Sequence, residues 1–141
     1  MANIDAVMVK NKAILIVDDE PLILMALRRE LRSNLGAGYL YETASDATEG
    51  LAVIEELVRE GIRIVLVVSD WLMPGMKGDE FLLEVRRRYP DVRTIMITGQ
   101  ADEAQIARVR QAGALDAFFS KPWNADRLFE TCRDLLSSQS A

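Results

Sequence analysis

Short apolar runs alternate along the chain with longer segments whose apolar residues recur every three or four positions. The apolar runs are typical of strands covered on both faces, and the longer spacing is typical of helices that lie on a sheet. Each predicted strand is followed by a predicted helix, and five such units predict an α/β protein with a doubly wound parallel sheet. The predicted strands are 13–17, 39–43, 64–68, 94–97 and 116–119.

Signals for helix starts support these units. Pro21 stands where a first helical turn begins, which is a favoured position for proline. Asp46 with Glu49 and Asp102 with Gln105 have the spacing of capping boxes. Strand 64–68 is the most apolar and is therefore predicted to be central, whereas the more polar strand 39–43 is predicted to lie at an edge.

Polar residues follow the predicted strands at their carboxyl ends. They are Asp18 and Asp19 after the first strand, Asp70 after the third, Thr98 after the fourth and Lys121 after the fifth. Parallel strands end on the same rim of a sheet, where ligands of doubly wound proteins bind, so these side chains are predicted to converge. Carboxylates, a hydroxyl and an ammonium together suit a divalent cation and a phosphoryl group.

The chemistry of this set favours magnesium. Three carboxylates at close range repel one another unless a cation compensates them, and Mg²⁺ prefers oxygen ligands. Asp70 or a neighbouring carboxylate can itself be the nucleophile of phosphoryl transfer, which gives an aspartyl phosphate. Lys121 and Thr98 can then bind phosphoryl oxygens, and Gly99 is predicted to let the backbone pass close to the site.

Composition excludes several classes of function. The chain has 141 residues, enough for one domain, with 17 Lys and Arg against 22 Asp and Glu, a net charge of −5. This balance argues against nucleic-acid binding, and the one basic cluster, Arg86–Arg88, is interpreted as a helix C-terminus. No apolar run approaches the roughly 20 residues of a membrane span. There is no histidine, and the single Cys132 is predicted to pack in the core of a cytoplasmic protein.

Four stretches carry a resemblance to a known family: ILIVDDEP, VVSDWLMPGMKGDEFL, IMITGQAD and AGALDAFFSKPW. In this order the chain resembles the receiver domain of two-component response regulators of the chemotaxis-regulator type. The resemblance implies a flavodoxin-like fold, a five-stranded sheet in the order 2-1-3-4-5 flanked by five helices. It assigns 13–136 to the receiver domain, 1–12 to an N-terminal extension, and 137–141 to a flexible tail or the start of a linker.

The resemblance also implies roles for the acidic residues. Asp70 would be the phosphoacceptor. Mg²⁺ would be bound directly by Asp19 and Asp70, by the backbone carbonyl of Leu72, and through water by Asp18. The phosphoryl group would come from the phosphohistidine of a sensor histidine kinase or a histidine phosphotransfer protein.

The remaining site residues would report the phosphorylated state. Thr98 would be the switch hydroxyl, Lys121 would bind the phosphoryl group next to a cis Pro122, and Phe118 would be the switch aromatic residue. The surface of the fourth helix, fifth strand and fifth helix would then change and control a downstream effector or a fused output domain. Neither direct nucleic-acid binding nor a membrane is implied, and a phosphorylation-dependent homodimer is left open.

Four residues near the site set expectations for this chain. Phe118 lacks the hydroxyl of the more familiar tyrosine, so packing alone would carry the switch. Leu72 stands where many receivers have a polar residue near the attacking water, which predicts a long-lived phosphoryl state, although Gln100 could still orient a water. Trp71, next to Asp70, is expected to sense cation binding by fluorescence.

Two other functions compete with a phosphorylation-controlled switch. An aspartate-nucleophile phosphohydrolase of the haloacid dehalogenase type carries an Asp-x-Asp motif after its first strand, and that spacing is missing after 13–17. A receiver-like scaffold without phosphorylation would not need all five polar residues. The chain is therefore not expected to be an enzyme, apart from catalysing its own phosphorylation and slow dephosphorylation. Charged residues that could serve a dimer are interpreted instead as a solvated face: Arg108, Asp116, Arg127 and Glu130.

Overall fold

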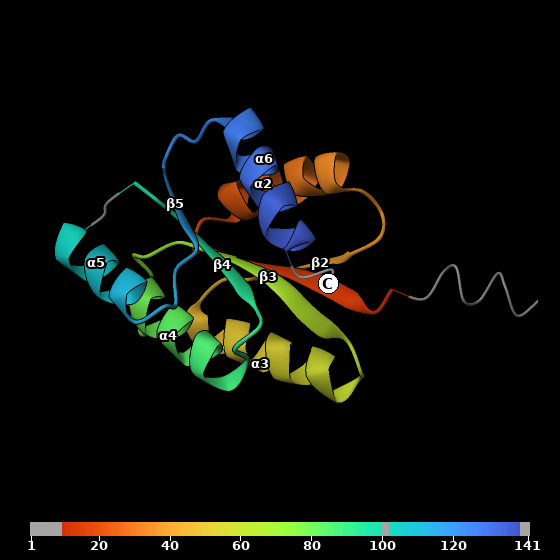
Figure 1. Cartoon of the computed structure of the whole chain (residues 1–141), viewed down its shortest axis with the longest axis horizontal. Coiled ribbons are helices and arrows are strands. Elements are labelled where there is room, and N and C mark those ends of the chain that lie inside the picture. Colours follow the sequence, from red (N-terminus) through yellow and green to blue (C-terminus); the bar gives the residue numbers. More distant parts are fainter. Residues whose placement is uncertain (1–9, 100–101, 139–141) are drawn as a thin grey trace, which may run out of the picture.

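Five parallel strands form a single sheet in the order β2-β1-β3-β4-β5 (Figure 1). The structure is a computed structural model that describes residues 10–99 and 102–138. The strands are β1 (Lys12–Val17), β2 (Leu40–Ala44), β3 (Arg63–Ser69), β4 (Arg93–Thr98) and β5 (Ala117–Ser120). The helices are α2 (Pro21–Leu35), α3 (Ala47–Arg59), α4 (Gly78–Arg88), α5 (Glu103–Gln111) and α6 (Ala125–Ser137). The predicted strand order, the central β3 and the edge position of β2 are confirmed.

The helices cover both faces of the sheet. Figure 1 shows α2 and α6 on one face and α3, α4 and α5 on the other. Alternate residues of β1 point to these two layers, because successive side chains of a strand lie on opposite faces. Leu15 belongs to the core under α3–α5 together with Phe81, whereas Ile14 and Ile16 belong to the core under α2 and α6 together with Leu128. This double burial explains why the strands are apolar without interruption.

The capping predictions are correct in one case and half correct in the other. Asp46 accepts a hydrogen bond from the backbone N–H of Glu49 at 2.7 Å, and the Glu49 carboxylate accepts one from Ser45 N–H. Asp102 likewise accepts from Ala104 N–H at 2.9 Å. However, Oε1 of Gln105 is buried without a hydrogen-bond partner among the described residues, so the predicted return bond of this second box is wrong.

The basic cluster at the end of α4 is paired within the chain. Arg87 and Arg88 both contact the Glu84 carboxylate at 2.6 Å, and their hydrogen bonds lower the pKa of Glu84 to about 2. Arg86 contacts Asp116 at 2.8 Å, across to the loop before β5. The prediction of a helix C-terminus is confirmed, and Asp116, which is exposed as expected of a solvated face, also pairs with Arg86.

Cys132 lies in the core between α6 and the sheet, as predicted. Its side chain is fully buried, and this burial raises the pKa of the thiol to about 12. Within residues 10–99 and 102–138, no helix is both long and apolar enough to cross a bilayer. Most of the predicted N-terminal extension 1–12, most of the tail 137–141 and the whole of Gln100 lie outside the described residues.

Candidate functional site

The carboxyl ends of β1, β3, β4 and β5 bring the predicted polar residues together. The N–H of Asp70 donates to the carbonyl of Val17 at 2.9 Å, which joins the end of β3 to the end of β1. The N–H of Lys121 donates to the carbonyl of Thr98 at 3.0 Å, which joins the ends of β4 and β5. The convergence that parallel strands imply is therefore observed.

Lys121 lies at the centre of this group. Its Nζ is 2.8 Å from Oδ2 of Asp18, 3.1 Å from Oδ2 of Asp70 and 3.3 Å from Oε1 of Glu20. Burial alone would lower the pKa of Lys121, but its hydrogen bond to Asp18 and the charge of Asp70 outweigh burial and raise it. The ammonium is therefore held in its charged form, where it compensates two nearly buried carboxylates.

Asp70 is held in a fixed orientation. Its side chain is 6% exposed, and Oδ1 accepts hydrogen bonds from the backbone N–H of Trp71 at 2.7 Å and of Leu72 at 3.4 Å. The other oxygen faces Lys121. Donors thus contact both oxygens of this carboxylate, and the backbone donors keep it at the rim of the sheet.

An acidic cluster surrounds the Lys121 ammonium. One carboxylate oxygen each of Asp18, Asp19, Glu20 and Asp70 lies within 4.8 Å of the others. Asp18 and Asp70 are buried, whereas Asp19 and Glu20 are exposed. Burial raises the pKa of Asp18, against the lowering effect of its hydrogen bonds from Lys121 and from the N–H of Glu20. A set of oxygen donors with partly exposed members fits a hard divalent cation such as Mg²⁺.

An open pocket of about 590 Å³ lies beside the cluster. Thr98, which is 2% exposed, and Leu72, which is 42% exposed, both line it. The Lys121–Pro122 peptide bond is cis, as predicted. The proposed ligand role of the Leu72 carbonyl stays a prediction. The pocket is lined by Asp19, Glu20, Asp70, Leu72, Met73, Pro74, Thr98, Gly99 and Lys121.

Phe118 lies on β5 opposite Met96 of β4. It is partly buried and packs against the core under α3–α5, on the face that α5 covers. Trp123 is also partly buried and packs against the opposite core, as expected for a residue at the rim. The role of Phe118 as a switch residue stays a prediction.

Two residues that matter for the geometry have no role in the sequence interpretation. Glu20 contributes a carboxylate to Lys121, and its only sequence signal is a third consecutive acidic residue after β1. Gly78 is closely packed on the phosphoacceptor candidate, because a Cβ at this position would lie 2.2 Å from the carbonyl oxygen of Asp70. Gly99 lines the pocket, and a Cβ there would meet the Lys121 side chain at 3.8 Å, so the close approach of its backbone to a bound phosphoryl group stays a prediction.

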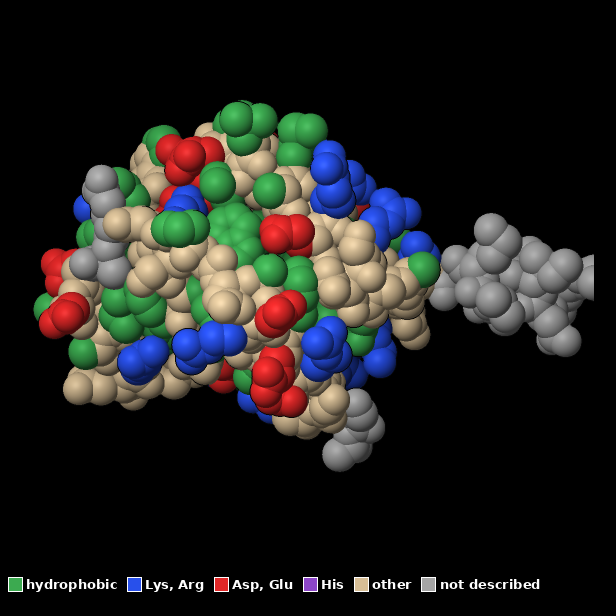
Figure 2. Space-filling model, turned by 90° about the horizontal axis from the view of Figure 1, so that it is seen from above, with side chains coloured by type: hydrophobic (Ala, Val, Ile, Leu, Met, Phe, Trp, Pro, Cys, Tyr) green, Lys and Arg blue, Asp and Glu red, His purple; other side chains and the backbone are tan. Residues whose placement is uncertain are grey.

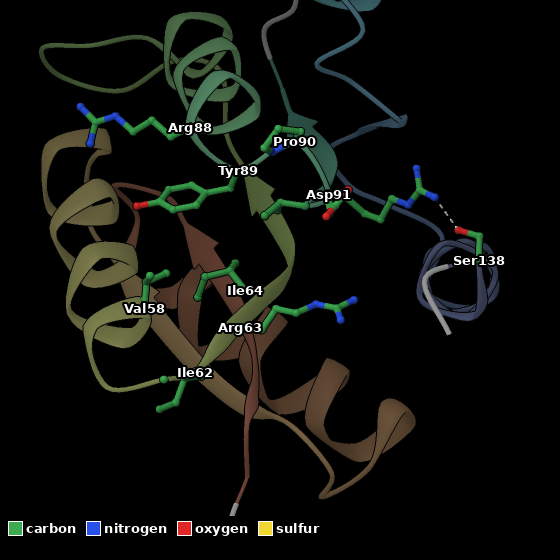
Figure 3. A pocket seen from close by; sticks show the side chains of 12 residues that line it. Val58, Ile62, Arg63, Ile64, Arg88, Tyr89, Pro90, Asp91 and Ser138 are labelled. Carbon is green, nitrogen blue, oxygen red and sulfur yellow. Dashed lines mark hydrogen bonds between the residues drawn. The ribbon is translucent and has the colours of Figure 1, made fainter. Parts of the chain in front are cut away.

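A larger pocket of about 800 Å³ lies at the opposite end of the sheet (Figure 3). It is lined by Arg63, Arg88 and Arg93, with Asp91 as its acidic residue. Arg88 is paired with glutamates, and Arg93 donates to Ser138 at 2.9 Å. This pocket holds none of the residues predicted for the site.

Comparisons with known proteins agree with this geometry. The family profile named "Response regulator receiver domain" matches residues 14–133. Chemotaxis protein CheY-3 of Vibrio cholerae is 32% identical over 128 residues, which cover 89% of this chain and 92% of that protein. A CheY-like receiver domain structure from Methanospirillum hungatei is 35% identical, with a TM-score of 0.78 over 91% of this chain and 95% of that one. The flavodoxin-like fold is thus confirmed.

Other relatives are much longer than this chain. Sensor kinase CckA of Brucella abortus is 36% identical over 129 residues, which cover 92% of this chain and 13% of the kinase. The hydrogenase transcriptional regulatory protein HoxA of Cupriavidus necator is 38% identical, and the matched part is 25% of that regulator. The match over nearly all of this chain, in short and long relatives alike, shows that it belongs to the response regulator receiver domain family.

Proposed function

We propose that the protein is a phosphorylation-activated signalling switch in which Asp70 accepts the phosphoryl group. The observation that carries this proposal is the Lys121 ammonium, 3.1 Å from Asp70 and 2.8 Å from Asp18, at the edge of an open pocket. A cation of this kind next to a nearly buried carboxylate can receive and stabilise the charge of a phosphoryl group.

The transfer from a phosphohistidine proceeds by displacement at phosphorus. A carboxylate oxygen of Asp70 forms the new bond, the bond to the imidazole nitrogen of the donor breaks, and the imidazole keeps the electron pair. Lys121 and Thr98 bind oxygens of the transferred group. Mg²⁺ would be held by Asp19, Asp70 and the Leu72 carbonyl, and through water by Asp18, and would neutralise charge on the phosphoryl oxygens. The donor is a sensor histidine kinase or a histidine phosphotransfer protein, and the reaction takes place in the cytoplasm.

The signal leaves the site through the sheet. Thr98 moves toward the phosphoryl group, and Phe118 fills the space that it leaves, which shifts the surface of α5, β5 and α6. Phosphorylation thus biases two arrangements that already exist in equilibrium. This surface controls an effector protein, an output domain on the same chain or a second copy of the protein.

Acetyl phosphate with Mg²⁺ tests the proposal. The wild-type protein is expected to gain the mass of one phosphoryl group, and Asp70→Asn is expected to gain none, because an amide is a poor nucleophile. Chelation of Mg²⁺ is expected to prevent the gain in wild type. Turnover of a phosphate monoester such as p-nitrophenyl phosphate would indicate a phosphohydrolase instead, and absence of any modification would indicate a scaffold.

The phosphoryl group is expected to be long-lived because Leu72, an exposed apolar residue, lines the pocket. Leu72→Asn offers a hydrogen bond to an attacking water and is expected to shorten the lifetime about tenfold, the effect of about 1.4 kcal/mol from one hydrogen bond. Loss of mass after removal of acetyl phosphate measures the lifetime, and Leu22→Asn, outside the pocket, is the control. Rapid decay in wild type would contradict this expectation.

The exposed face of α2 is the proposed docking surface for the phosphodonor protein. Leu22 and Met25 are 79% and 60% exposed, next to Glu20, which contacts Lys121. Figure 2 views the molecule from the side of α2 and α6 and shows exposed hydrophobic side chains with a group of Lys and Arg side chains nearby. Arg29 and Arg32 of α2 line the same groove as Met25. An acidic donor with an apolar contact surface fits these features.

Met25→Gln is therefore expected to weaken phosphoryl transfer from a protein donor about tenfold, the effect of losing one good apolar contact of about 1.4 kcal/mol. Labelling by acetyl phosphate, which needs no docking, is expected to stay unchanged. The donor is a phosphorylated histidine phosphotransfer protein that labels the wild type. Val58→Gln, an exposed apolar residue on α3, is the control. An equal loss with both donors would exclude docking at this surface.

A further inference from the structure

A chain of contacts connects Asp70 to α5 without passing through Thr98 or Phe118. The backbone N–H of Trp71 donates to Asp70, and the indole Nε1–H of the same residue donates to Oδ1 of Asp79 at 3.2 Å. Oδ2 of Asp79 accepts from Nη2 of Arg108, on α5, at 2.5 Å. Three side chains, those of Trp71, Asp79 and Arg108, thus join the Asp70 loop to α5.

Asp79 is unusual among these contacting residues because its acidic side chain is only 4% exposed. A buried carboxylate is costly unless it is paired and hydrogen-bonded. The contacts that the described residues offer to its oxygens are the Trp71 indole and the Arg108 guanidinium. Separation of α5 from α4 would therefore leave a buried charge without its cation.

Contacts join the Asp70 loop to the start of α4, whereas in this series of contacts α5 is joined to α4 through the Arg108 side chain. The N–H of Gly78 donates to the carbonyl of Trp71 at 2.8 Å, and Nζ of Lys77 lies 5.2 Å from the centre of the Trp71 ring. Arg108 is 55% exposed and reaches Asp79 from the surface. The ion pair between Asp79 and Arg108 is thus the contact in this series that a shift of α5 would alter.

We propose that Asp79 is a positioning residue that couples α5 to the Asp70 loop, and that its ion pair with Arg108 favours the unphosphorylated arrangement. This inference rests on the proposed function. The ion pair is expected to favour the unphosphorylated arrangement because of how α5 is connected to β4: α5 begins at Glu103, soon after β4 ends at Thr98. Movement of Thr98 toward a phosphoryl group displaces the start of α5 relative to α4, and the ion pair opposes that displacement.

Binding of beryllofluoride with Mg²⁺, followed by Trp71 fluorescence in a Trp123→Phe background, tests the coupling. Arg108→Gln is expected to bind beryllofluoride about fivefold more tightly, because one restraint on the active arrangement is gone. Arg110→Gln is the matched control. This exposed arginine lies on the same helix and has no charged partner among the described residues, so its affinity is expected to stay within about twofold of wild type.

Asp79→Asn tests whether the charge of Asp79, and not only its packing, couples α5 to the Asp70 loop. The amide oxygen still accepts from the Trp71 indole, but the charge that attracts Arg108 is removed, and a similar gain in affinity is expected. Combined with Arg108→Gln, it is expected to give no further gain, because both substitutions remove the same contact. If Asp79→Asn does not fold, the surface variant Arg108→Gln still decides the question.

The outcomes distinguish the two proposals. A wild-type protein that shows neither a beryllofluoride response nor Asp70-dependent phosphorylation overturns the proposed function and the coupling with it. A normal wild-type response that Arg108→Gln leaves unchanged overturns the coupling alone. Additive effects of the two substitutions also overturn it, since they would show that Asp79 and Arg108 act separately.

Discussion

Replacement of Lys121 by Met is expected to destabilise the metal-free protein by about 3 kcal/mol. The substitution removes the ammonium that lies within 3.3 Å of the carboxylates of Asp18, Asp70 and Glu20. Two of these carboxylates are nearly buried, so they would repel one another without compensation. Thermal and urea unfolding in the presence of a chelator measure the loss.

Mg²⁺ is expected to restore much of the stability of Lys121→Met. With one positive charge fewer beside the acidic cluster, the variant should bind a divalent cation more tightly than wild type does, by isothermal titration. Phosphorylation by acetyl phosphate is nevertheless expected to fall about 100-fold, because a charge that stabilises the transferred group is missing. Lys12→Met, an exposed lysine at the other end of β1, should change neither property.

The loss of stability in Lys121→Met is expected to depend on pH. In wild type, burial already raises the pKa of Asp18, and the hydrogen bond from Lys121 holds it down. Without that bond the pKa of Asp18 rises further, so the folded variant binds a proton more readily than the unfolded chain. Its deficit relative to wild type should shrink as the pH falls from about 7 toward about 4. A deficit that stays constant over this range would contradict the assigned role.

Replacement of Gly78 by Ala is expected to cost about 3 kcal/mol and to impair phosphorylation of Asp70 at least tenfold. The added Cβ would lie 2.2 Å from the Asp70 carbonyl oxygen and 2.6 Å from Cα of Trp71. Both are backbone atoms, so neither can rotate away, and the loop that orients Asp70 has to shift. Unfolding by urea and the rate of labelling by acetyl phosphate measure the two effects.

Gly99→Ala is the matched control for this prediction. It also adds one methyl group at the site, but its nearest neighbour is the Lys121 side chain at 3.8 Å, an ordinary contact. Its stability is expected to stay within about 0.5 kcal/mol of wild type, and labelling should persist. If Gly99→Ala were the more damaging substitution, the close packing would have been assigned to the wrong glycine.

Local patterns were a poor guide to individual side-chain partners. Gln105 has the spacing of a capping box, yet its Oε1 finds no partner among the described residues, because burial and rotamer decide the contact. Arg108 reads as a solvated charge on a helix, yet it pairs with a buried carboxylate 29 positions earlier in the chain. Spacing along a helix predicts contacts within that helix and carries no information about contacts with the next helix.

Sequence patterns alone predict the order of strands and helices and the convergence of Asp18, Asp70, Thr98 and Lys121 on one rim. Apolar periodicity identifies the elements, and parallel strands necessarily end on the same side of a sheet.

Which of these groups are in contact, and which residues hold them in place, follows from the packing of the whole fold. Lys121 bridges Asp18 and Asp70, 103 and 51 positions away, Gly78 packs on the backbone of Asp70, and the Asp79–Arg108 pair joins two helices. Contacts between groups so far apart in the chain depend on how helices and strands pack, to within fractions of an ångström.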